Sequence, residues 1–118
     1  MGEVREFELG AILSMTTGHS CVDEFGKVFE LVWFVCDDPF INSMGIGMVG
    51  EDVKKHLLTI HPELRNVIFR RGQNVEKFMR VQEEKFGKYL PVTREGEKLP
   101  KEYNESKKLV KTKQINGR

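Results

Sequence analysis

The chain has 118 residues, of which 39% are hydrophobic and 31% charged, and its formal net charge is only +1. This length suits one domain whose core folds without stabilising disulfides or metal ions, and we expect no second domain. No apolar run approaches the roughly 20 residues that span a bilayer, and no signal-type segment opens the chain. We therefore expect a soluble protein with no membrane partner.

The charge is divided unevenly along the chain. Residues 1–92 carry 11 basic and 14 acidic side chains, whereas residues 93–118 carry 8 basic and 4 acidic ones. Gly96 and Pro100 interrupt the basic segment, which has few apolar residues and is typical of a solvated, disordered tail. The sequence thus predicts a helical globular domain over 1–92 and a charged, flexible tail over 93–118. Contact of this tail with an acidic surface or a phosphate backbone is the alternative.

The first predicted element is a short helix within residues 7–18, FELGAILSMTTG. Its apolar residues recur at the spacing of one helix face: Leu9, Ile12 and Leu13. Gly18 suits the left-handed position that ends a helix. Hydroxyls near this end either bond back to carbonyls of the preceding turn or reach outward to a ligand: Ser14, Thr16 and Thr17.

Apolar residues are densest from Val22 to Cys36, which predicts a central and nearly surrounded second helix. Asp23 suits its N-cap or first turn, and the run Asp37-Asp38-Pro39 ends it. A strand over residues 31–36 is the alternative, because aromatic and β-branched residues favour pleated surfaces. Cys21 and Cys36 would lie about 22 Å apart along such a helix, too far for a disulfide. They therefore indicate reduced thiols in a reducing cytosol.

Residues 40–50, FINSMGIGMVG, predict a flexible loop that carries methionines, since three glycines fall within six residues. Gly45, Gly47 and Gly50 match the spacing GxGxxG. No suitable strand precedes them, however, and no basic residue or hydroxyl is placed to meet a pyrophosphate. We therefore expect neither a dinucleotide-binding fold nor a cofactor.

Two further helices are predicted in the second half of the chain. One begins at Asp52, ends at His61 and Pro62, and has a buried face of Val53, Leu57 and Ile60. The other is capped by Asn74, ends at Gly87, and has an apolar face of Val75, Phe78, Met79, Gln82 and Phe86. Tyr89 to Val92 are extended and apolar and should fold back along the core. The predicted fold is thus mainly α, a compact bundle of about four helices, with short extended segments as an open feature.

Three segments together resemble an uncharacterised family of small tailed-phage proteins: FELGAILSMTTG at 7–18, HPEL at 61–64 and FGKYLPV at 86–92. Members begin with a similar Glu-Leu-Gly, Ile-Leu-Ser, Thr-Thr-Gly run and end their core with Gly-x-Tyr-Leu-Pro-Val. Residues 34–50 depart from the family pattern, which has a Met-Thr-Gly-Asp turn and a Thr-His pair there. The resemblance implies phage origin and a location in the host cytoplasm, and it supplies no catalytic residues.

We expect neither catalysis nor a metal site. His19 and Cys21 are two residues apart, so their side chains point apart, and no third group is placed to orient them. His56 and His61 are five residues apart and lie on different faces of a helix, which disfavours a shared metal ion.

Binding suits the sequence better. Small donors follow the first helix, where hydroxyls and backbone N–H groups can converge on an anionic, nucleotide-like ligand: Thr16, Thr17, Gly18, His19 and Ser20. Arg70 and Arg71 belong to the most basic patch of the acidic domain and are expected to add charge. With the phage resemblance, this gives the hypothesis of an accessory protein that sequesters a small nucleotide-type signal of host defence.

Two other function classes stay open. One is a protein that docks on and inhibits a host defence complex, for example a CRISPR effector, through the basic tail and the methionine loop. The other is a nucleic-acid-binding phage regulator, which the acidic domain and the lack of a recognisable helix-turn-helix disfavour. A helix as apolar as residues 25–36 in so small a domain also favours a homodimer.

Overall fold

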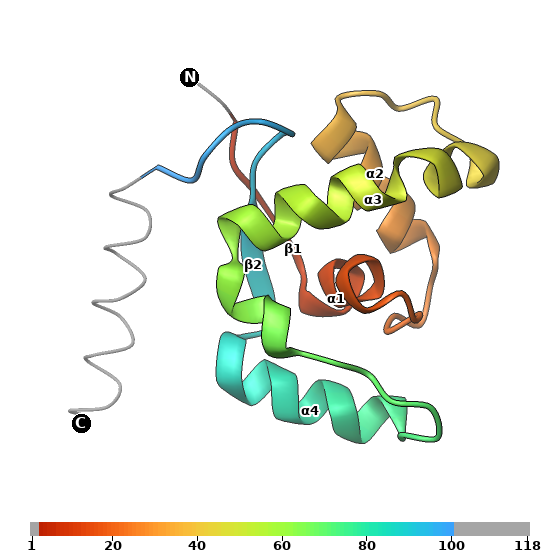
Figure 1. Ribbon diagram of the computed structural model, residues 1–118, viewed down its shortest axis with the longest axis vertical. Coiled ribbons are helices and arrows are strands. Elements are labelled where there is room, and N and C mark those ends of the chain that lie inside the picture. The colour runs from red at the N-terminus through yellow and green to blue at the C-terminus, as the bar shows by residue number, and fades with distance from the viewer. Residues whose placement is uncertain (1–2, 101–118) are drawn as a thin grey trace.

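The computed structural model describes residues 3–100, and it confirms a mainly α fold with four α-helices and one small sheet. Strands and helices follow one another as β1 (Arg5–Glu8), α1 (Leu9–Thr17), α2 (Gly26–Cys36), α3 (Ser43–Ile60), the 3₁₀ helix η1 (Pro62–Asn66), α4 (Val75–Phe86) and β2 (Tyr89–Val92). Figure 1 shows α1 in the middle of the molecule, with α2, α3, α4 and the two strands around it.

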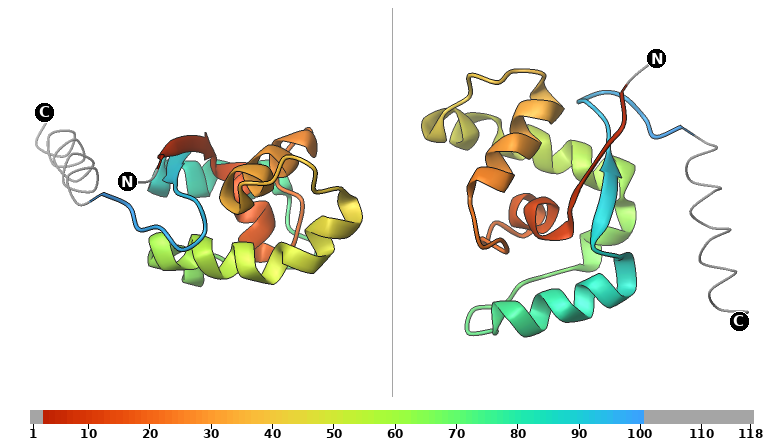
Figure 2. Two further views of the ribbon diagram at one scale, coloured as in Figure 1. Left: turned by 90° about the horizontal axis from the view of Figure 1, so that it is seen from above. Right: turned by 180° about the vertical axis from the view of Figure 1, so that it is seen from behind.

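The sheet joins the two ends of the domain. β1 and β2 pair antiparallel, with Arg5 opposite Val92 and Glu8 opposite Tyr89 (Figure 2). The prediction that Tyr89 to Val92 are extended and fold back along the core is confirmed. Its partner strand was missed, because Phe7 is the only buried residue of β1 and its neighbours are charged.

α1 is the most enclosed helix, because seven of its nine residues are buried, against five of eleven in α2. Leu9, Ile12 and Leu13 are fully buried, as their spacing predicts. Gly18 follows the helix with a φ of 81°, the left-handed conformation expected of it. The central position assigned to the second helix therefore belongs to the first.

α2 is a helix, as predicted, and not a strand, but it starts four residues later than expected. Phe25 occupies the N-cap position, and Asp23 accepts a hydrogen bond from the Lys27 ammonium (2.9 Å) and does not cap the helix. Its outer side carries three aromatic rings that contact one another edge-to-face or tilted and stay partly exposed: Phe25, Phe29 and Trp33. α2 is therefore packed on one side only and is not nearly surrounded.

The predicted loop over residues 40–50 is wrong, because α3 begins at Ser43 and runs through all three glycines. The Asn42 side chain caps this helix by accepting a hydrogen bond from Gly45 N (2.9 Å). Trp33 fixes the approach to the cap, since its indole N–H donates to the Ile41 carbonyl (2.8 Å). A cap and a tertiary contact thus outweigh the low helix propensity of glycine, and Asp52 lies inside the helix and does not begin it.

α4 matches its prediction. The Asn74 side chain accepts a hydrogen bond from Lys77 N (3.0 Å), and Gly87 follows the last turn with a φ of 91°. Phe78, Met79 and Gln82 are the buried residues. The periodic apolar face of a capped helix was sufficient to predict this element.

The packed domain extends beyond Val92, the boundary expected from composition. Thr93 is buried, and its carbonyl accepts a hydrogen bond from Nε2 of His56 (2.8 Å). Glu95 N donates to the Val35 carbonyl (2.8 Å), and Arg94 contacts Asp37 (3.3 Å). The remainder of the predicted tail, residues 101–118, lies outside the described residues.

Candidate functional site

The hydroxyls at the end of α1 hold the following turn in place. Ser14 Oγ donates to the Gly10 carbonyl (2.7 Å) and accepts from Cys21 N (2.7 Å). Thr17 Oγ1 donates to the Leu13 carbonyl (2.6 Å) and accepts from His19 N (3.2 Å). The two hydroxyls therefore use the first of the two options open to them, bonding back to the preceding turn, and they also recruit N–H groups of residues 18–21.

This arrangement differs from the prediction that backbone N–H groups after α1 converge on an anionic ligand. The N–H groups of Gly18, His19 and Cys21 are all bonded within the turn, so they do not converge on an outside ligand. The end of α1 also carries the negative pole of the helix dipole, which disfavours an anion there. Positive charge for a ligand must come from side chains on other elements.

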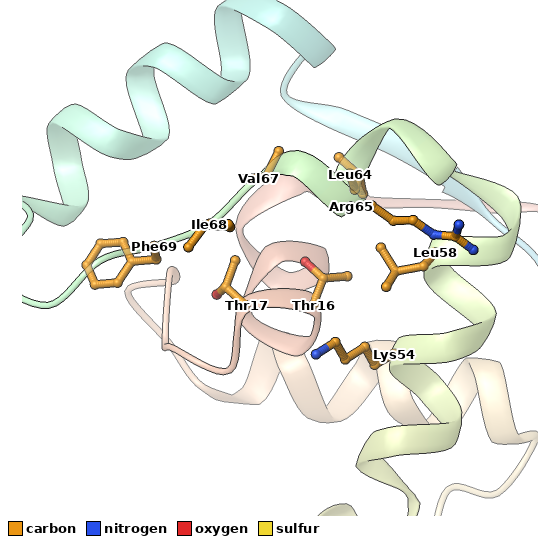
Figure 3. A pocket seen from close by; sticks show the side chains of 9 residues that line it. All are labelled: Thr16, Thr17, Lys54, Leu58, Leu64, Arg65, Val67, Ile68 and Phe69. Atoms are coloured by element: carbon orange, nitrogen blue, oxygen red, sulfur yellow. The ribbon is translucent and has the colours of Figure 1, made fainter.

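Those side chains line a hollow of about 330 Å³ on the α3 side of the turn, here called the α1–α3 hollow. α1 contributes Thr16 and Thr17, and α3 contributes Lys54 and Leu58. The segment through η1 supplies the rest of the lining: Leu64, Arg65, Val67, Ile68 and Phe69. In Figure 3, the two threonines project from α1 toward the space between Lys54 and the 64–69 segment.

The α1–α3 hollow has a positive lining. Among the residues that the structure describes, Lys54 and Arg65 are the only ionisable ones in its lining, so no carboxylate of this part of the chain lines it. Within residues 3–100, neither of these cations forms an ion pair with an acidic side chain. Leu58, Val67 and Ile68 add apolar surface, and Thr16 makes only a long hydrogen bond to the Leu13 carbonyl (3.4 Å). The lining can thus meet an anionic group and a flat apolar group together.

A second hollow, of about 350 Å³, lies on the other side of Thr17 and Lys54. Gly18, His19 and Ser20 line it together with Phe25 of the chain before α2 and with the glycine-rich part of α3. Glu51 lies in this lining next to Lys54, so the second hollow has no excess of positive charge. It suits an anion less well than the α1–α3 hollow does.

The structure thus separates the predicted site residues into three places. Thr16 lines the α1–α3 hollow, Thr17 lines both hollows, and the second hollow also has Gly18, His19 and Ser20 in its lining. Arg70 and Arg71 line neither, because the chain turns at Gly72 and leaves both exposed.

The loop that carries these arginines is nevertheless anchored beside the α1 turn. The Phe69 ring contacts His19 on one side (4.9 Å between centroids) and Phe78 of α4 on the other (5.1 Å). This stack fixes the wall of the α1–α3 hollow that ends at Phe69. His19 therefore has a positioning contact in addition to its place in the second hollow.

Sequence reasoning missed Lys54 and Arg65. Neither residue is among those that the sequence analysis places at the ligand site, although both line the α1–α3 hollow. Lys54 lies four residues before Leu58, so it shares a helix side with a residue of the hollow. That spacing was the available signal, whereas the approach of Arg65 depends on a long-range packing contact.

The surroundings of the two cysteines and of His61 determine where their protons lie. Burial raises the pKa of the Cys21 thiol. The pKa of the Cys36 thiol is raised by burial and by the nearby carboxylates of Glu95, Asp38 and Asp52. Both thiols therefore stay protonated near neutral pH. Nε2 of His61 lies 2.7 Å from the Pro91 carbonyl, which only accepts, so this nitrogen carries the proton. Among residues 3–100, no three His, Cys, Asp or Glu side chains are grouped closely enough to hold a metal ion.

Comparisons of the chain with protein-family models, curated proteins and solved structures find no match. Across the part of the chain that the structure describes, no helix combines the length and apolar character needed to cross a membrane. Function must therefore be argued from the residues of the two hollows.

Proposed function

We propose that this protein binds a small anionic ligand of the nucleotide type in the α1–α3 hollow and thereby sequesters it. Lys54 and Arg65 would contact the phosphate, and the side chains of Leu58, Val67 and Ile68 would cover the base. In the phage setting that the sequence resemblance implies, the ligand would be a signal of host defence. This binding needs no chemical step by the protein.

The observation that carries the proposal is the pair of cations in one hollow whose lining, within residues 3–100, includes no carboxylate. A lysine and an arginine that have no ion-pair partner within residues 3–100 retain their full charge for a ligand. Charge-assisted hydrogen bonds are about twice as strong as neutral ones. The hollow of about 330 Å³ is also within the size range of small-ligand pockets.

Calorimetric titration with three kinds of probe tests the proposal: nucleotides (cyclic and linear), nucleosides and inorganic phosphate. We expect nucleotides to bind more tightly than either fragment, because only they use both the cations and the apolar wall. Binding should weaken as salt rises, since the cations are partly exposed. If none of these probes binds saturably, the proposal is contradicted.

Substitutions locate the site. Lys54→Gln and Arg65→Gln should each weaken binding about 10- to 100-fold, the equivalent of a lost charge-assisted contact of about 1.5–3 kcal/mol. Lys55→Gln is the matched control, because Lys55 is the next residue of α3 and does not line this hollow. Ile68→Ser should weaken the binding of nucleotides and leave that of phosphate unchanged.

A further inference from the structure

The first half of α3 has no buried residue. From Ser43 to Asp52 every position is partly or fully exposed, and Val53 is the first buried residue of the helix. Its outer side carries two large apolar side chains at helical spacing, Met44 and Met48, which are 78% and 79% exposed, and Phe40 in the turn before the helix is 89% exposed. Figure 1 shows this part of α3 at the margin of the molecule, beside α2.

Up to Gly50 this surface lacks the charges that usually cover the outer side of a helix, and the exposed Glu51 and Asp52 follow it. Residues 39–50, PFINSMGIGMVG, contain no charged side chain. An exposed helix normally carries charged or polar residues opposite its buried side. We call the surface formed by Phe40, Met44, Gly47 and Met48 the α3 face, and its composition is that of an interface and not of a solvated helix.

We propose that a second copy of this chain packs on the α3 face, with the two α3 helices antiparallel about a two-fold axis near Ile46 and Gly47. A Cβ added at Gly47 meets no atom within 4 Å, so this position permits close approach of another helix. In that arrangement Met44 of each copy meets Met48 of the other. A surface without charge can pair with itself without repulsion.

The exposed apolar side chains of the α3 face supply most of the area that such a dimer needs. If each large side chain has a surface of roughly 200 Å², the exposed fractions of Phe40, Met44 and Met48 correspond to a total exposed area of roughly 500 Å². Phe25, which is 48% exposed and lines the second hollow with Gly47, adds roughly 100 Å². Together with a rim of polar neighbours, this approaches the roughly 800 Å² that each partner contributes to a standard interface.

The same pairing would complete the second hollow. Its α3 wall includes Gly47, which also belongs to the α3 face, together with Ile46, Gly50, Glu51 and Lys54. A partner helix crossing at Gly47 would therefore cover the rim of the second hollow. The α1–α3 hollow lies on the opposite side of Lys54 and stays open.

Sedimentation velocity of the full chain over micromolar to submillimolar concentrations tests this proposal. The expected result is a reversible dimer of twice the 13.7 kDa chain mass. The double substitution Met44→Glu and Met48→Glu places four like charges at the interface and should weaken the dimer at least about 100-fold. Val81→Glu is the matched control, because Val81 is an exposed apolar residue (47%) on α4 and should leave the dimer unchanged.

Gly47→Ala separates pairing from folding. It should raise the unfolding temperature of the monomer by roughly 4–8 °C, because alanine favours a helix and its Cβ meets nothing within the molecule. It should also weaken the dimer, since the Cβ holds the crossing helices apart. A chain that stays monomeric over the whole concentration range would overturn the proposal. The same holds if the α3 face binds a different protein and never a second copy of the chain. A dimer that tolerates the glutamates would also overturn it.

Discussion

Replacing Ser14 with alanine tests how the turn beside both hollows is held. Ser14 is 8% exposed, and its hydroxyl joins Gly10 of α1 to the N–H of Cys21 (2.7 Å each). The Gly10 carbonyl keeps its helical hydrogen bond in the variant, whereas the Cys21 N–H loses its partner. An unpaired buried donor costs about 1–3 kcal/mol, and the higher helix propensity of alanine returns about 0.5 kcal/mol. The free energy of unfolding should therefore fall by about 1.5 kcal/mol, and Tm by about 6–12 °C.

Thr59→Ala is the matched control. Thr59 makes the same type of hydrogen bond, from its hydroxyl to the Lys55 carbonyl four residues earlier (2.8 Å), but it is exposed and accepts no N–H. Its replacement should leave stability unchanged or raise it by up to about 0.5 kcal/mol. Thermal and urea unfolding followed by circular dichroism measure both variants, and amide exchange at Cys21 should accelerate only in Ser14→Ala. Equal stability of the two variants would refute this account of the turn.

Three further outcomes follow from local geometry. Gly10→Ala should lower the free energy of unfolding by about 1–3 kcal/mol despite the gain in helix propensity. The reason is that the new Cβ would lie 2.5 Å from the Cys21 carbonyl oxygen. A rise in Tm would contradict this close approach of the Cys21 backbone to α1. Asn74→Ala should lower the free energy of unfolding by about 1 kcal/mol, and Asn74→Asp should lower it much less. Only aspartate retains a side-chain oxygen that accepts the hydrogen bond from Lys77 N. Equal losses of stability in urea unfolding would exclude Asn74 as the helix cap. Burial raises the pKa of the Cys21 thiol, so the contribution of this thiol to stability should be constant below pH of about 8. Above that pH the contribution should fall by at most about 1.4 kcal/mol per pH unit, because the thiol ionises first in the unfolded chain. The pKa of Cys36 is raised too, so Cys21→Ala should reduce, and not abolish, the slope of stability against pH in this range; an unchanged slope would contradict the contribution of Cys21.

The helices at the two ends of the domain were predictable because their signals are local. α1 combines Leu9, Ile12 and Leu13 on one face with Gly18 at its end, and α4 lies between the Asn74 cap and Gly87. Each signal acts within a few residues and needs no knowledge of the rest of the chain.

The first half of α3 and the strand β1 were not predictable in this way. Glycines in residues 45–50 favour a loop on propensity alone, and the helix forms there because Asn42 caps it and Trp33 fixes the preceding carbonyl. β1 carries one buried residue and is defined by its pairing with β2, more than 80 residues away in the chain. Both elements depend on contacts that no short sequence window contains.

The candidate site was predictable only in part for the same reason. Thr16 and Thr17 were predicted because they lie at the end of a recognisable helix, and they do line the α1–α3 hollow. Its charge comes from Lys54 and Arg65, on two elements that tertiary packing brings to the end of α1. Arg70 and Arg71, the arginines expected to contribute, line neither hollow.

Mapping amide chemical-shift changes during titration with nucleotides tests the proposed binding most directly. We predict saturable changes at Thr16, Thr17, Lys54 and residues 64–69, and their loss in the double variant Lys54→Gln and Arg65→Gln. Changes confined to residues 70–73, or no saturable change with any nucleotide, would contradict a ligand site between α1 and α3.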